Sequence, residues 1–156
     1  SEQAFDFSLL ATFMALSGLA SLVSAPIWGR LSDLSSRKVL VFAAMLVTLN
    51  GFAVYLVAYL SPQTLNEFWL LPLCYFLLTV AHQGVRLGRK TYLVDMAEGN
   101  KRTDYVSVSN TVIGVILLLL GSVGLLNTYL TTAELIFFYS ILGLLGAISA
   151  WFLPDA

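Results

Sequence analysis

Residues 29–38 read GRLSDLSSRK and form a short polar segment between two long uncharged runs, residues 7–28 and 39–60. An α-helix rises about 1.5 Å per residue, so about 20 residues cross the roughly 30 Å hydrocarbon core of a bilayer. Each flanking run reaches that length, and the polar segment is short enough to be a surface turn. The stretch therefore predicts two membrane-spanning helices joined at one face of the membrane.

The composition of the whole chain agrees with this reading. Of the 156 residues 58% are apolar and 11% charged, which is too apolar for a soluble domain of this size. The alternating pattern of barrel strands is absent, so each run must satisfy its own backbone as a helix. We predict an all-α polytopic membrane bundle, one transmembrane domain over residues 1–156. Its five spans are expected at about 7–28, 39–60, 68–88, 105–126 and 134–153.

The basic residues predict the orientation of these spans. All eight fall in two clusters, and the connections at 61–67 and 127–134 contain none. Because positively charged loops are retained inside, both clusters are expected to face the cytoplasm, with the N-terminus outside. The eight residues are Arg30, Arg37, Lys38, Arg86, Arg89, Lys90, Lys101 and Arg102.

Residue types that catalysis needs are scarce. Cys74 and His82 are the sole cysteine and histidine, and the sequence has no glycine-rich phosphate loop, metal-ligand cluster or nucleophile beside a base. We therefore expect no enzyme, no cofactor, no metal site and no nucleic-acid partner.

Polar residues inside the predicted spans are the candidates for a transport pathway. His82 and Gln83 lie in the inner half of the third span, and Arg86 follows His82 by four residues on one helical face. That face could line a water-filled cavity, and an imidazole carries protons readily near neutral pH. The alternative, which we favour for His82, is a hydrogen bond inside the bundle with Arg86 reaching the interface. For Asn50 and Asn110 a helix-to-helix hydrogen bond is likewise the favoured alternative.

Two stretches resemble one known family. GRLSDLSSRKVL, residues 29–40, resembles the loop signature of the major facilitator superfamily, although Leu34 and Ser36 stand where a basic residue and a glycine are usual. GVRLGRKTYLVDMAEGNKRTDYVSVSN, residues 84–110, resembles the connection between the fourth and fifth helices of each half of that fold. The signature positions that match are Gly29, Leu31, Asp33, Arg37, Lys38 and Leu40.

The resemblance implies a place in the fold and a function. The degenerate signature favours helices eight to twelve, in the C-terminal half, over helices two to six. It implies a secondary active transporter of a small solute, working by alternating access in the bacterial inner membrane. Its partners would be the missing N-terminal half, membrane lipids, the solute and protons. A non-transporting scaffold or assembly factor on the same fold is the alternative.

The resemblance also implies a cytoplasmic gate. The signature acid, here Asp33, closes the cytoplasmic side by meeting a basic partner and the positive N-terminal end of a neighbouring helix. From the residues alone, the fourth span begins in the same layer, near Thr103, and helix N-termini attract anions. Gly29 would let helices cross closely. The candidate gating residues are Gly29, Asp33, Arg37, Lys38 and Arg102.

Two further expectations concern charged side chains of this layer. Asp33 and Arg37 would share a face if the helix persists between them. Asp95 and Glu98 are expected to pair with Lys101 and Arg102, or to join a charge network that holds the inward-closed state.

Overall fold

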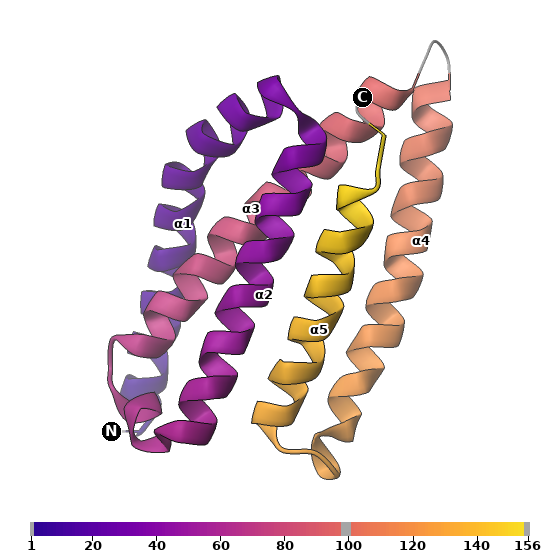
Figure 1. The fold of residues 1–156 in the computed structure, drawn as a ribbon. Coiled ribbons are helices and arrows are strands. Elements are labelled where there is room, and N and C mark those ends of the chain that lie inside the picture. The colour runs from indigo at the N-terminus through magenta and orange to yellow at the C-terminus, as the bar shows by residue number, and fades with distance from the viewer. Residues whose placement is uncertain (1, 98–100, 155–156) are drawn as a thin grey trace.

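A computed structural model describes residues 2–97 and 101–154 of the chain. Within those ranges it contains five long helices and no strand, so the predicted all-helical fold is confirmed. Each helix is long and apolar enough to cross a membrane, and successive helices run in opposite directions (Figure 1). The helices are α1 (Glu2–Leu34), α2 (Ser36–Leu60), α3 (Leu70–Met96), α4 (Arg102–Val123) and α5 (Thr132–Trp151), with short 3₁₀ helices η1 (Pro62–Asn66) and η3 (Gly124–Thr128).

The turn between α1 and α2 is much shorter than the polar segment that the sequence shows. α1 continues to Leu34 and α2 begins at Ser36, so Ser35 alone is non-helical. Ser35 has an extended backbone, and its hydroxyl accepts a hydrogen bond from the backbone N–H of Lys38 at 3.3 Å, which caps α2. The predicted limits followed hydropathy, whereas helical hydrogen bonding continues into the polar layer. Asp33 therefore lies in the last turn of α1.

The third helix shows the same difference at its end. The expected span ended near residue 88, but α3 runs to Met96. Its last two turns thus bring Arg89, Lys90 and Asp95 onto a rigid helix.

α5 begins with a capping box at the opposite end of the bundle. Thr131 Oγ1 accepts a hydrogen bond from the backbone N–H of Glu134 at 3.3 Å. The Glu134 carboxylate in turn accepts a hydrogen bond from the backbone N–H of Thr131 at 2.7 Å.

α2 is the centre of the packing. It lies against α3 on one side and α5 on the other. The α2–α5 approach is close because small residues face one another: a Cβ placed on Gly51 would collide with the Ser140 side chain. Small residues allow such an approach where lipid supplies no hydrophobic drive for association.

α1 packs chiefly on α3, and a tryptophan fixes the contact. Trp28 is 7% exposed and packs with Val39 and Ala43 of α2. Its indole Nε1–H donates to the carbonyl oxygen of Val80 on α3 at 2.8 Å. Gly84 of α3 makes room for the ring, since an added Cβ would lie 2.7 Å from Trp28 Cε2.

α4 stands at the edge of the bundle, and none of its described residues is buried. Figure 1 shows it beside α5. The Tyr139 hydroxyl of α5 donates to the carbonyl oxygen of Leu120 on α4 at 2.9 Å. Within the part of the chain that the structure describes, α4 makes no close backbone contact with α1.

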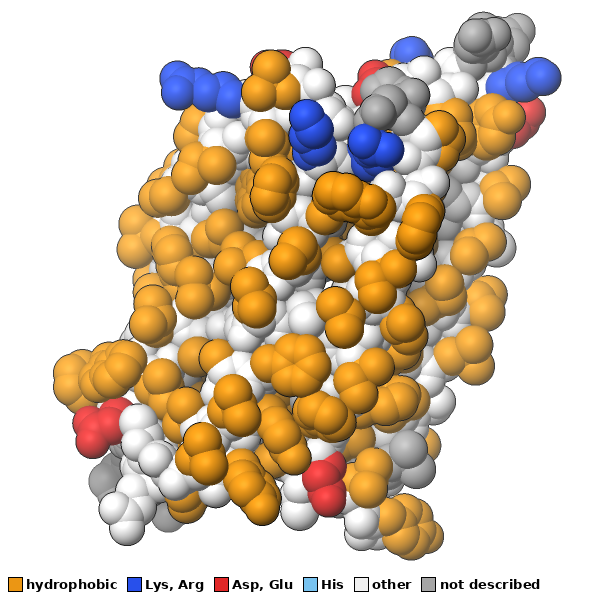
Figure 2. All heavy atoms as spheres, viewed as in Figure 1, with side chains coloured by type: hydrophobic (Ala, Val, Ile, Leu, Met, Phe, Trp, Pro, Cys, Tyr) orange, Lys and Arg blue, Asp and Glu red, His pale blue; other side chains and the backbone are white. Residues whose placement is uncertain are grey.

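Charged side chains are distributed unevenly along the bundle. Figure 2 shows Lys and Arg gathered at one end, with apolar side chains over the middle of the face in view. This end holds the α1–α2 turn and the last turns of α3, and we call it the basic end. The described structure thus has the charge asymmetry from which the sequence predicted an orientation.

Candidate functional site

A polar pocket lies between α1 and α3. It has a volume of about 530 Å³, and Val47 of α2 also contributes to its wall. Its polar residues on α3 recur at intervals of three or four, so they form one stripe along the helix. The polar lining residues are Ser17, Tyr75, Thr79, His82, Gln83 and Arg86.

Gln83 is held in place within this pocket. Its side-chain Nε2–H donates to Ser21 Oγ of α1 at 3.0 Å, and the Ser21 hydroxyl donates to the Ser17 carbonyl oxygen at 2.9 Å. Gln83 therefore links α3 to α1 and presents the rest of its amide to the pocket.

His82 and Arg86 are placed differently from Gln83. Both side chains are exposed, and neither makes a hydrogen bond or ion pair with any residue that the structure describes. The hydrogen bond inside the bundle that we expected for His82 is therefore not found within the described residues. The structure brings together His82, Gln83 and Arg86, three of the five predicted pathway residues.

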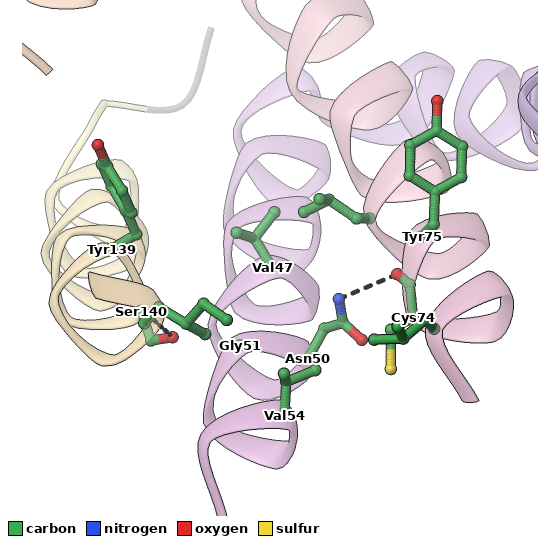
Figure 3. A pocket seen from close by; sticks show the side chains of 11 residues that line it. Val47, Asn50, Gly51, Val54, Cys74, Tyr75, Tyr139 and Ser140 are labelled. Carbon is green, nitrogen blue, oxygen red and sulfur yellow. Dashed lines mark hydrogen bonds between the residues drawn. The ribbon is translucent and has the colours of Figure 1, made fainter. Parts of the chain in front are cut away.

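Asn50 belongs to a second, apolar pocket of about 420 Å³ between α2, α3 and α5 (Figure 3). Its side-chain Nδ2–H donates to the carbonyl oxygen of Cys74 on α3 at 3.1 Å, which is the helix-to-helix bond favoured from the sequence. Across the pocket, α5 contributes Tyr139 and Ser140. The two pockets border one another, because Val47, Tyr75 and Leu78 line both.

Asn110 is not brought to either pocket. It is an exposed residue of α4, and α4 stands apart from the α1–α3 contact. Thr79, by contrast, lines the polar pocket and was not among the predicted residues. Its spacing from His82 and Arg86 on one helical face was the signal that could have identified it.

The predicted gate residues are only partly assembled. Asp33 and Lys38 are exposed at the basic end. Arg37 is half-buried, and its Nη1–H donates to the carbonyl oxygen of Leu153, after α5, at 3.0 Å. Asp33 and Arg37 do not share a helical face, because the extended Ser35 interrupts the helix between them. An added Cβ on Gly29 would meet no atom of the described residues within 4 Å, so no close helix crossing among those residues needs this glycine.

Asp33 lies beside α3 rather than at the start of α4. It lines a pocket of about 440 Å³, which we call the acidic pocket. Arg102 is the first residue of α4, and among the described residues α4 makes no close backbone contact with α1, so Asp33 does not lie against the N-terminal end of α4. Glu98, considered with Asp95 for a charge network, lies outside the described residues. Besides Leu34, the acidic pocket is lined by Ser32, Asp33, Ser35, Ser36, Thr91 and Asp95.

The family model described as Major Facilitator Superfamily matches residues 1–156, the whole sequence. No curated protein and no solved structure matches the chain.

Proposed function

Because the chain belongs to the Major Facilitator Superfamily, we propose that it acts in secondary active transport, moving a small solute by alternating access. It is an integral membrane protein of a transporter superfamily, with five helices able to cross a bilayer. A fold hosts more than one function, so the specific activity must be argued from the residues of the site.

The polar pocket is the observation that supports this proposal. Placing a charged side chain at the centre of a membrane helix costs about 2.5–3.5 kcal/mol on insertion scales, so such residues usually face a hydrated cavity. α3 carries His82, Gln83 and Arg86 together on the wall of one pocket. Since His82 and Arg86 have no partner among the described residues, their donors are free to bind a solute.

The adjoining pockets favour a solute with two chemical parts. Arg86 offers several N–H donors in a plane, which suits an acidic group or another strong acceptor. The apolar pocket next to it suits a hydrocarbon or aromatic portion. We therefore propose a small amphipathic molecule with an acidic or acceptor group, with His82 carrying the coupled proton.

The basic end is proposed to be the cytoplasmic side, in a bacterial inner membrane, following the rule that positive loops stay inside. Asp33 lies exposed at this end and is proposed to act in the gate with Lys38. Alternating access requires two bundles that rock against one another. An N-terminal half of the same transporter is proposed to supply the second bundle and the basic partner of Asp33.

Cysteine accessibility tests whether the polar pocket is a water-filled pathway. In a cysteine-free version of the full chain, Thr79→Cys places a thiol on the pocket wall, and Leu118→Cys on exposed α4 serves as a control. A water-soluble, membrane-impermeant maleimide should label Thr79→Cys, because the thiolate forms only in water. It should leave Leu118→Cys unlabelled, because the neighbouring exposed side chains of α4, Leu117 and Leu119, are apolar. An unreactive Thr79→Cys in a folded protein, from both sides of the membrane, would show that the pocket is closed to water.

A further inference from the structure

The apolar pocket between α2, α3 and α5 makes few polar demands on the group that fills it. Among the described residues, no charged side chain lines it. Three of its polar residues already use their side-chain donors inside the protein, each on a backbone carbonyl oxygen. They are Asn50, Tyr139 and Ser140. The group that suits this pocket is therefore apolar.

Two tyrosine rings give the pocket a more specific character than a purely aliphatic one would have. Figure 3 shows Tyr75 on α3 and Tyr139 on α5 on opposite sides of the pocket, with Val47 of α2 between them. Aromatic rings attract one another through their quadrupoles, in addition to the hydrophobic effect of the area that they bury. A ligand with an aromatic ring would therefore gain more here than a saturated one.

Both rings are held by contacts outside the pocket. The ring of Tyr75 packs edge-on against Phe13 of α1, with ring centroids 4.9 Å apart and an interplanar angle of 69°. The Tyr139 hydroxyl donates to the carbonyl oxygen of Leu120 on α4 at 2.9 Å. Neither Phe13 nor Leu120 lines the pocket. The two rings are thus positioned before a ligand arrives, and they lose little conformational freedom when it binds.

The volume of the pocket sets the size of the apolar group. A dry apolar cavity of about 150 Å³ is large enough to bind benzene. The pocket has a volume of about 420 Å³, so it accommodates one aromatic ring and part of the chain attached to that ring.

The distance to the polar pocket sets the length of the solute. Tyr75 lines both pockets, so it marks the point where the two parts of a solute would join. His82 and Arg86 follow it on the same face of α3 by about two and three turns, or about 10 and 16 Å along the axis. Helical side chains lean toward the N-terminal end of their helix, which brings the end of Arg86 nearer to Tyr75. An acidic group at Arg86 and a ring beside Tyr75 are therefore separated by on the order of 10 Å.

We propose that the transported solute is an elongated aromatic acid, with its ring between Tyr75 and Tyr139 and its acidic group at Arg86. The proposal rests on the transport function proposed above, because it names the solute class of the same site. Tyr75 and Tyr139 are then the residues that determine specificity. A lipid chain or a saturated hydrocarbon would gain only the burial of its surface in this pocket.

Three matched acids can test this proposal. Phenylhexanoate and cyclohexylhexanoate, each with its ring at the end of the chain, differ only in whether the ring is aromatic. Pentylbenzoate is an isomer of phenylhexanoate in which the ring is attached to the carboxylate instead. Equilibrium binding to the full natural chain in nanodiscs of zwitterionic lipid, corrected for empty nanodiscs, requires no transport. We expect phenylhexanoate to bind about 3- to 10-fold more tightly than either of the other acids.

Variants show whether the two tyrosines cause this preference. Tyr75→Leu and Tyr139→Leu should each reduce it to about twofold or less. Tyr139→Phe keeps the ring and should keep the preference. Phe42→Leu is the matched control, since Phe42 is an exposed aromatic residue of α2 that lines neither pocket. The comparison of the three acids on wild type remains decisive if a leucine variant fails to fold.

The proposal is overturned if wild type binds cyclohexylhexanoate or pentylbenzoate as tightly as phenylhexanoate, or if the preference survives in both leucine variants. Binding that Arg86→Gln still weakens would in that case leave the proposed function standing, with a solute that is not an elongated aromatic acid. If none of the three acids binds to the folded protein up to about 10 mM, both the proposed solute class and the proposed solute pocket are wrong.

Discussion

Replacing Gly84 by alanine should disrupt the contact between α1, α2 and α3. The new Cβ would lie 2.7 Å from Trp28 Cε2 and 2.9 Å from Ala43 Cβ. Neither neighbour can move away easily. The Trp28 ring is held by its hydrogen bond to Val80, and a Cβ atom such as that of Ala43 has no rotamer that avoids the clash. The helices must therefore separate.

The change in the free energy of unfolding of Gly84→Ala follows from two opposing effects. Overpacking a well-packed core costs about 1–3 kcal/mol. Replacing glycine by alanine in a helix interior gains up to about 1 kcal/mol from backbone entropy. Gly146→Ala is the matched control, because an added Cβ there meets no described atom within 4 Å. The difference between the two variants cancels the helix term, so Gly84→Ala should be less stable than Gly146→Ala by about 1–3 kcal/mol.

Equilibrium unfolding in mixed micelles of a mild detergent and a denaturing detergent measures this difference. Tryptophan fluorescence reports the transition, since Trp28 leaves a buried site when α1 separates. Equal unfolding free energies for the two variants, within about 0.5 kcal/mol, would refute the packing of α1 on α3 described above.

Two smaller effects can be measured in the same unfolding assay. Thr131→Ala removes the side-chain acceptor of the α5 capping box and should lower the free energy of unfolding by about 1 kcal/mol. An unchanged free energy of unfolding would mean that the cap does not form in the membrane. Asn50→Ala removes the hydrogen bond to the Cys74 carbonyl oxygen and should lower the free energy of unfolding by about 0.6–1.7 kcal/mol, with little effect on transport. Loss of transport at unchanged stability would instead place Asn50 in the solute pathway.

The number and type of the helices could be predicted because each uncharged run must form its own backbone hydrogen bonds in lipid. Hydropathy predicted the end of α2 at Leu60, but it did not predict where α1 and α3 end. Leu34 and Met96 end helices that continue beyond the apolar runs, and the turn at Ser35 depends on a local cap. That difference changed the position of Asp33, from a loop to a helix terminus.

Grouping within one helix was predictable, whereas grouping between helices was not. The four-residue spacing of His82 and Arg86 predicted their common face, and both line the polar pocket. Asp33 and Asp95 are 62 residues apart in the sequence, and both line the acidic pocket because α1 packs on α3, a tertiary contact that no local pattern predicts. Asn110 was proposed by residue type alone, and it lies on a helix away from both pockets.

Solute uptake into proteoliposomes tests most directly whether the polar pocket of α3 carries the transported molecule. The full natural chain would be assayed against a panel of small amphipathic acids, with a proton gradient applied. We predict that the wild-type protein accumulates the solute when the gradient is applied. The rate of this accumulation should fall at least about tenfold in His82→Ala and in Arg86→Gln, which corresponds to a loss of about 1.4 kcal/mol of transition-state stabilisation. Thr111→Ala, on exposed α4, should transport as wild type does. Accumulation that persists unchanged in both pocket variants would contradict the assignment, and the pathway would have to lie elsewhere in the bundle.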